Sequence, residues 1–189
     1  MNRPTAGFDT ARLRHTVLAA WAASPARFRE DANAEEELVL GAYRDRLVVE
    51  LAQNAADAAT RAGRPGRLRL TLRQDDDAVV LSVANTGAPL NADGVSALCT
   101  LRASAKRDGP SVGRFGVGFA AVLAVSDAPA VHSRTGAVRW SALEAATAAA
   151  EIPALSTELA QRAGRAPVLR LPFDTGGAPP PGWDTEVVL

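Results

Sequence analysis

The chain has 189 residues, and its 21 Lys plus Arg are balanced by 21 Asp plus Glu. A net charge near zero argues against a nucleic-acid partner held mainly by phosphate contacts. Cys99 is the only cysteine, which excludes an internal disulfide framework and a cysteine-based metal site. No apolar run reaches membrane-spanning length and no apolar signal core begins the chain, so we expect a cytoplasmic protein with no membrane partner.

Helical spacing of apolar residues predicts three helices in the first third of the chain. The first covers 10–23, and Ser24-Pro25 ends it and begins a second helix that includes the acidic run 35–37. A third, long helix is predicted over 41–61. Its expected buried side contains Leu47, Val48, Leu51, Ala55 and Ala58. We expect residues 1–42 to pack on the same domain as residues 43–189.

The rest of the chain predicts strands interrupted by helices. Residues 67–73 (RLRLTLR) alternate basic and apolar side chains, and 79–83 return as the second strand of a hairpin. A short helix is expected at 93–101, and an apolar helix should follow the glycines at 113, 116 and 118 and end near 125. Further strands are expected at 130–133, 137–140, 168–171 and 185–189, with a helix at 141–150.

This order is typical of an α+β fold, a two-layer sandwich. We expect a mixed, mostly antiparallel sheet covered by helices on one face. The chain stops on an apolar strand residue, Leu189, which suggests a piece of a longer protein. Its richness in Ala, Arg, Gly and Pro, with few Lys, is typical of a GC-rich bacterial genome.

Three polar residues share one face of the third predicted helix. Glu50, Asn54 and Asp57 are spaced by four and three, so they can project together into a cleft. An amide oxygen suits magnesium, and a carboxylate one turn away can orient or deprotonate a water molecule. Taken one at a time, each of these residues is better explained as part of a solvated polar stripe.

Two loops carry the other candidate residues. Glycines at 113, 116 and 118 permit close approach of a ligand, and the helix after them offers free N–H groups to an anion. Asn85-Thr86-Gly87 follows a strand, where a polar side chain can reach a base edge. Each loop is weak evidence alone, because packing glycines and ordinary turns are common.

Together the motifs resemble those of the GHKL ATPase superfamily of gyrase, heat-shock protein 90, histidine kinases and MutL, whose domain is the Bergerat fold. ELAQNAADA at 50–58, VANTGAPL at 83–90 and SVGRFGVGFAAVLAVSD at 111–127 are similar to its three motifs. The FGVGF string after LRASAK at 101–106 resembles the heat-shock protein 90 and sacsin-like branch, and DTEVVL at 184–189 resembles that branch's closing strand. The resemblance covers roughly 43–189.

The resemblance implies a role for each matching position. Glu50 would be the general base, and Asn54 would ligate Mg²⁺. Asp57 would order the site near the nucleotide, and Lys106 would reach it from the edge of a lid. Backbone N–H groups for the phosphates would come from Gly113, Gly116, Val117, Gly118 and Phe119. The adenine would be held by Asn85, Gly87, Leu90 and Thr185.

The implied function is that of a chaperone-type ATPase domain that binds Mg-ATP, hydrolyses it slowly and acts on a protein client. Two alternatives stay open: a nucleotide-dependent interaction switch with little hydrolysis, and a protein kinase of the histidine-kinase or anti-sigma-factor type. The family usually has Asp where this chain has Asn85, so we expect adenine to bind with lower affinity. Pro89 replaces the second glycine of that motif.

Overall fold

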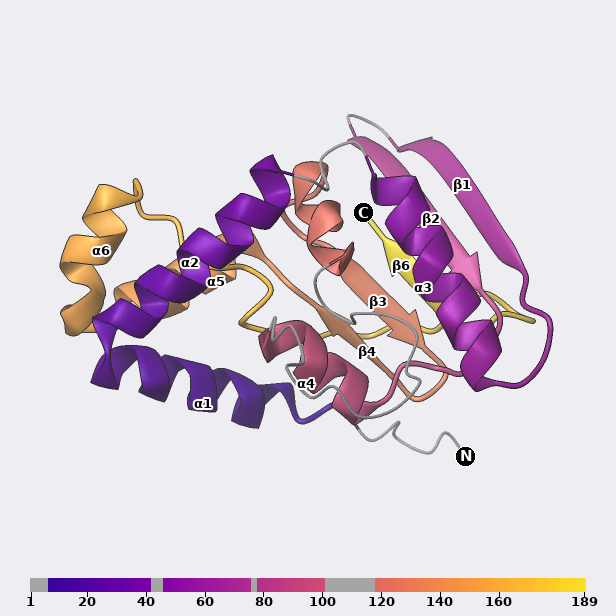
Figure 1. Ribbon diagram of the computed structural model, residues 1–189, viewed down its shortest axis with the longest axis horizontal. Helices are drawn as coiled ribbons and strands as arrows, with labels where there is room; N and C mark the ends of the chain where they lie inside the picture. Colours follow the sequence, from indigo (N-terminus) through magenta and orange to yellow (C-terminus); the bar gives the residue numbers. More distant parts are fainter. Residues whose placement is uncertain (1–6, 42–45, 76–77, 101–117) are drawn as a thin grey trace.

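A computed structural model describes residues 7–41, 46–75, 78–100 and 118–189 (Figure 1). The helices are α1 (Thr10–Ala23), α2 (Pro25–Leu40), α3 (Leu47–Arg61), α4 (Ala92–Thr100), α5 (Ala142–Ala150) and α6 (Ser156–Gln161), with 3-10 helices η1 (Gly118–Ala124) and η2 (Pro153–Leu155). The strands are β1 (Leu68–Asp75), β2 (Ala78–Asn85), β3 (Ala130–Ser133), β4 (Gly136–Arg139), β5 (Phe173–Asp174) and β6 (Thr185–Val188). The predicted α+β fold is confirmed.

The six strands form one sheet in the order β1-β2-β6-β3-β4-β5. All pairings between the described strands are antiparallel, in agreement with the mostly antiparallel sheet that the sequence predicts. The last strand, β6, lies between β2 and β3 and runs antiparallel to both. This insertion joins the first hairpin to the rest of the sheet and leaves β1 and β5 at the two edges.

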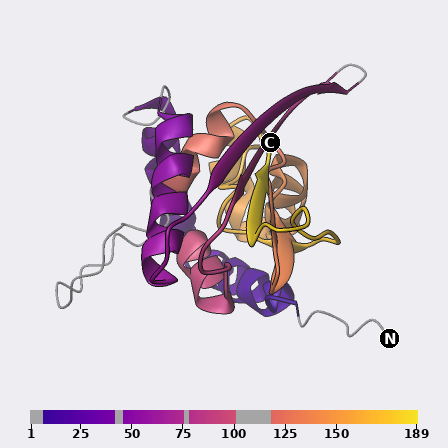
Figure 2. The same ribbon diagram turned by 90° about the vertical axis from the view of Figure 1, so that its right-hand side faces the viewer.

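The main core lies between the sheet and one layer of helices. α3, α4 and η1 lie over the same face of the sheet, as the two views show together (Figures 1 and 2). Leu51 of α3, Val95 of α4 and Phe119 of η1 pack there against Val83 and Val131 of the sheet. Burial of this apolar area is the main favourable contribution to folding of the layer.

The segment 175–184 runs over the opposite face. A Cβ added at Gly177 would lie 2.8 Å from Nε2 of His132 on β3, so the backbone passes directly over that strand. Further along, the ring centroid of Trp183 lies 5.1 Å from the guanidinium carbon of Arg67, next to β1. The covering of this face by a loop explains how Ser82 and Ala84 of β2 are buried without a second helix layer.

A second core lies away from the hairpin, where α1 and α2 meet α5, η2 and α6 (Figure 1). Trp21 and Phe28 pack edge to face, with ring centroids 5.1 Å apart. Leu155 and Leu171 complete the cluster and are fully buried. The two N-terminal helices therefore bury their large side chains against the C-terminal half of the chain.

Several predicted element boundaries are wrong. The helix predicted over 41–61 begins at Leu47, because Gly41 ends α2 instead. Leu51, Ala55 and Ala58 are buried as predicted, whereas Val48 is 51% exposed because no described residue covers it on the first turn of α3. The apolar helix after Gly118 is a 3-10 helix, and the sequence did not predict η2 or α6.

The strand predicted at 168–171 is a turn. Leu169 and Leu171 are fully buried, which explains their apolar character without a strand. The N–H groups of Val168 and Leu169 donate to the carboxylate of Glu35, at 2.6 and 2.9 Å, so a side chain replaces the strand partner. The pattern of buried residues was correct, but it does not distinguish a strand from a buried turn.

A buried charge network joins this turn to α1, α2 and α4. Arg170 is 4% exposed, and its Nη2 lies 2.9 Å from Oδ1 of Asp31. The same guanidinium donates to the carbonyl of Cys99 at 3.1 Å, while Trp21 donates to Oδ2 of Asp31 at 3.0 Å. Burial raises the pKa of Glu35 to about 7, against the opposing effect of its two backbone hydrogen bonds and of Arg170.

Glu35 should make stability depend on pH. Between pH 4.5, the ordinary pKa of its carboxyl, and about 7, the folded protein holds a proton that the unfolded chain has released. The free energy of unfolding should therefore fall as the pH rises through this window, by at most about 1.4 kcal/mol per pH unit. Urea unfolding of Glu35→Gln should lack this decline, and the exposed control Glu37→Gln should keep it. A Glu35→Gln variant with the wild-type decline would contradict the assignment.

Candidate functional site

A cavity that is partly open to solvent lies between α3 and the central strands. Most of its lining is apolar: Leu51, Ala58, Val83, Ala88, Leu90, Leu98, Phe119, Val131 and Val187. Its polar lining consists of Asn54, Arg61, Asn85 and Thr185. A largely apolar slot with a few convergent polar groups is the usual form of a small-molecule site.

Two amide side chains in this cavity are available to a ligand. Asn54 comes from the middle of α3, and Asn85 is the last residue of β2. Thr185 is the direct cross-strand partner of Asn85, so the two side chains lie on the same face of the sheet. Within the described residues, neither amide side chain makes a hydrogen bond. An unbonded amide at the wall of a cavity favours a polar ligand.

Glu50 lies one turn before Asn54, against the start of η1. The side chain is 11% exposed, and its Oε1 lies 3.4 Å from Nη2 of Arg46. A Cβ added at Gly118 would lie 2.1 Å from Oε2 of Glu50. The missing side chain of Gly118 therefore leaves the room that the Glu50 carboxylate occupies, a role for this glycine that the sequence did not indicate.

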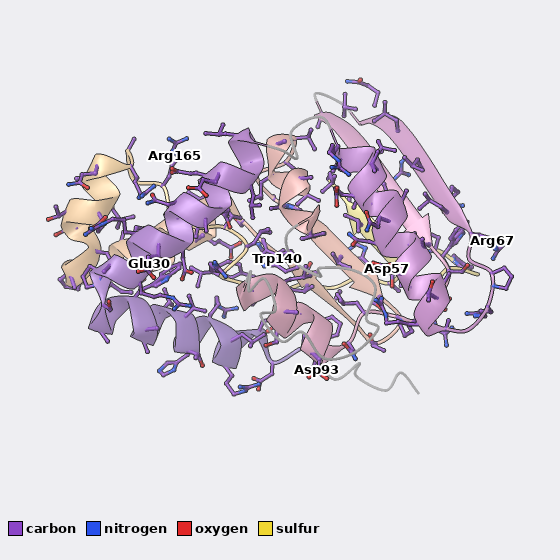
Figure 3. All side chains as sticks on the ribbon, in the orientation of Figure 1. Glu30, Asp57, Arg67, Asp93, Trp140 and Arg165 are labelled. Atoms are coloured by element: carbon purple, nitrogen blue, oxygen red, sulfur yellow. The ribbon has the colours of Figure 1, made fainter. Side chains whose placement is uncertain are left out.

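Asp57 continues the polar side of α3 and is 6% exposed (Figure 3). Arg61 lies one turn further and lines the cavity, a position that was not predicted from the sequence. Burial lowers the pKa of Arg61, and the charge of Asp57 opposes that shift. The i,i+4 spacing of Asp57 and Arg61 was the available signal, because it places both on one helix face.

The loop after β2 touches α3 at Gly87. This residue has φ +150°, and an added Cβ would lie 2.5 Å from the carbonyl carbon of Ala58. The next residue, Ala88, donates its N–H to the carbonyl of Ala58 at 2.8 Å. Glycine is thus required both by the backbone conformation and by the close approach of loop and helix.

The buried carboxylate of Asp184 holds this loop in place. Oδ2 accepts from the N–H of Gly87 at 2.9 Å and from Arg64 at 3.0 Å, and Oδ1 accepts from Arg134 at 2.5 Å. The backbone N–H of Asp184 donates to the carbonyl of Asn85 at 3.0 Å. The bond from Gly87 and the two arginines lower the pKa of Asp184, although burial opposes them. No sequence pattern had indicated Asp184 as part of the site.

Ser133, which the sequence did not indicate either, contacts two residues of the cavity lining. Its hydroxyl accepts from the N–H of Leu90 at 3.0 Å and lies 3.3 Å from the hydroxyl of Thr185. Leu90 and Phe119 contribute apolar lining, and the Phe119 ring packs against Trp140 with centroids 5.4 Å apart. The predicted residues Lys106, Gly113, Gly116 and Val117 lie outside the described residues.

Among the described residues, no group of three or more His, Cys, Asp or Glu is placed to hold a metal ion. None of the described helices is long and apolar enough to cross a membrane.

α3, the loop after β2 and all of the cavity lining except Thr185 and Val187 lie within one family match. Residues 44–150 match the model of the histidine kinase-, DNA gyrase B-, and HSP90-like ATPase family, which is more than half of the chain. The chain belongs to this family. Membership in this ATPase family implies ATP binding and an ATPase or kinase type of function. No curated protein gave a match.

Replacing Gly87 in this ATPase-family domain tests the contact between the loop after β2 and α3. Gly87→Ala should lower both the melting temperature and the affinity for ATP, because a Cβ would meet backbone atoms that cannot move aside. We expect a loss of roughly 1–3 kcal/mol in unfolding free energy. The matched control is Gly176→Ala, where an added Cβ has no heavy atom within 4 Å. Equal stability of the two variants would contradict the packing described for Gly87.

Proposed function

We propose that this chain binds Mg-ATP in the cavity between α3 and the sheet, as the ATP-binding domain of a heat-shock protein 90 or sacsin-like chaperone-type ATPase with slow hydrolysis. The observation that carries the proposal is the convergence of Asn54, Asn85 and Thr185 on an otherwise apolar slot. In this proposal α1 and α2 belong to the same domain. The protein acts in the cytoplasm on a protein client.

The base would lie deepest in the slot. Leu90 and the other apolar side chains offer flat contact area for an adenine ring, and Asn85 and Thr185 stand at one end of that area. Adenine offers an N–H donor and a ring-nitrogen acceptor at its edge, and an amide presents one acceptor and one donor. A neutral Asn85 can therefore bond to both the N–H donor and the ring nitrogen of adenine. Its hydrogen bond from the adenine amino group would be weaker than one to a charged acceptor.

The phosphates would lie toward the start of η1. Gly118 and Phe119 begin this helix, next to Glu50, and Lys106, Gly113, Gly116 and Val117 precede it in the chain. Asp57 would order this part of the site from α3, together with Arg61. Gly87 would act indirectly, by holding the loop after β2 against the helix.

Asn54 is the residue proposed to hold Mg²⁺. Its amide oxygen is a hard ligand, it lines the cavity, and it makes no hydrogen bond to a described residue. Magnesium commonly takes one or two protein ligands and completes its shell with phosphate oxygens and water, so the donor set fits without a carboxylate cluster. When bound, the ion supplies neutralisation of phosphate charge.

Glu50 would orient the attacking water and accept its proton. The carboxylate is nearly buried, and its Oε1 lies 3.4 Å from Nη2 of Arg46. This ion pair engages one of the two oxygens that an attacking water would need, which supports slow hydrolysis. It also favours the second candidate, a switch in which ATP changes a partner surface and hydrolysis is marginal.

Replacing Glu50 separates these two functions. The affinity of Glu50→Ala for Mg-ATP, measured by calorimetry, should lie within a few-fold of the wild-type affinity, because the carboxylate does not contact the adenine. Phosphate release should fall by about 100-fold or more, the usual contribution of a general base. A wild-type turnover that is negligible and unchanged by Glu50→Ala would support the switch. If no adenine nucleotide binds to the wild type, the proposed function is wrong.

The base contact has its own test. Asn85→Asp should bind Mg-ATP several-fold more tightly, because a charged oxygen accepts more strongly from the amino group of adenine. Arg61 in the same cavity offsets the added negative charge. Calorimetric titration of both proteins with Mg-ATP measures the difference, and Asn85→Gln, which keeps the neutral amide, is the control. Weaker binding by Asn85→Asp would contradict the role given to this position.

A further inference from the structure

The free edge of the sheet at β1 has the features of a binding site for an extended polypeptide. β1 is the first strand in the sheet order, and among the described strands it pairs only with β2. On β2, Leu81 exchanges both backbone hydrogen bonds with Leu189, at 3.0 and 2.9 Å. Hydrogen bonding alternates along antiparallel strands, so the β1 residue paired with Leu81, which is Leu72, directs its own N–H and carbonyl groups away from β2. Leu68, Leu70 and Leu72 therefore direct their N–H and carbonyl groups outward.

The same strand has two chemically different faces. On the helix side, Leu68, Leu70 and Leu72 are 36%, 43% and 70% exposed. The opposite face presents three exposed arginines: Arg67, Arg69 and Arg73. The eight consecutive pairs with β2 contain no bulge, and β1 contains no proline. Two common protections of an edge strand are thus missing, and only the charges remain.

Arg67 and Arg69 are held in place by contacts with the segment around Trp183, yet none of the three arginines is paired with a negative charge of a described residue. The guanidinium carbons of Arg67 and Arg69 lie 5.1 and 4.9 Å from the ring centroid of Trp183, and Arg67 also donates to the carbonyl of Gly182 at 3.0 Å. In the described part of the chain, none of the three arginines forms an ion pair with an acidic residue. Stacking on an indole fixes a guanidinium plane while leaving its edges free for a carboxylate.

Room for apolar side chains lies beside the strand. A groove open to solvent lies between α3 and the start of β1, with Ala52, Ala56 and Ala59 on the helix side and Leu68 on the strand side. A strand added to β1 would direct every second side chain toward the leucine face, where those near Leu68 would meet this groove, and the others toward the arginines. A second copy of β1 does not fit, because it would place arginines against arginines, which is unfavourable.

We propose that the edge of β1 binds an extended segment of a partner protein whose side chains alternate between acidic and apolar. The backbone of the segment would bond to Leu68, Leu70 and Leu72. Its carboxylates would face Arg69 and Arg73, and its apolar side chains would cover the exposed leucines. This binding mode adds a strand to the sheet, with main-chain bonds giving affinity and alternate side chains giving specificity. The proposal does not depend on nucleotide binding.

A peptide of alternating Asp and Val, as long as the 8 residues of β1, is the probe. Fluorescence anisotropy should detect its binding to the wild-type chain. The double variant Arg69→Glu/Arg73→Glu should bind at least about 10-fold more weakly, because like charges now face each other. Arg165→Glu is the matched control and should bind normally, since Arg165 and Arg67 lie at opposite ends of the molecule (Figure 3).

Two further measurements separate strand pairing from simple charge attraction. A peptide of the same composition with its Asp and Val in separate blocks should bind more weakly than the alternating one. Hydrogen exchange at the amides of Leu68, Leu70 and Leu72 should slow when the alternating peptide is bound. Any one of four results would overturn the proposal. Two concern the peptide: equal binding by the double variant, or unchanged exchange at these amides. The other two are tighter binding of an oligothymidylate to the same arginines, and dimerisation through β1.

Discussion

The buried carboxylate of Asp184 is the interaction on which the arrangement of the site depends. It joins the loop after β2, through Gly87, to Arg64 after α3 and to Arg134 in the β3–β4 turn. A carboxylate with 4% exposure is strongly unfavourable without such donors. Because Asp184 immediately precedes β6, the same bonds set the position at which the last strand enters between β2 and β3, and with it the place of Thr185 beside Asn85.

α3 has to satisfy two requirements along one helix. Leu51, Ala55 and Ala58 bury one arc in the main core, while Glu50, Asn54 and Asp57 lie on the adjoining arc. Two neighbouring segments approach the helix closely: a Cβ added at Gly87 would meet the backbone of Ala58, and a Cβ added at Gly118 would meet the carboxylate of Glu50. These contacts bring the loop after β2 and the start of η1 to the walls of the cavity. The polar arc is therefore enclosed by backbone rather than by large side chains.

The sequence predicted most elements because their patterns are local. The alternation in RLRLTLR predicted β1, and the spacing of apolar residues predicted α1. It failed where a distant group replaced the local rule. Val168 and Leu169 bond to Glu35, which lies in α2, so their apolar run forms a turn. The insertion of β6 beside β2 is likewise a pairing of residues 100 or more positions apart in the chain and has no local signal.

By itself the sequence determined that Glu50, Asn54 and Asp57 share one helix face, because helical geometry relates residues three and four apart. It also determined that glycines follow Asn85 and precede Phe119. Only the tertiary structure decided that Asn54, Arg61, Asn85 and Thr185 line one cavity, since they come from α3 and from two strands that the fold makes neighbours. Only the tertiary structure, too, placed Arg64 and Arg134 on Asp184. Neutralising a buried charge requires partners close in space, and their separation along the chain has no part in it.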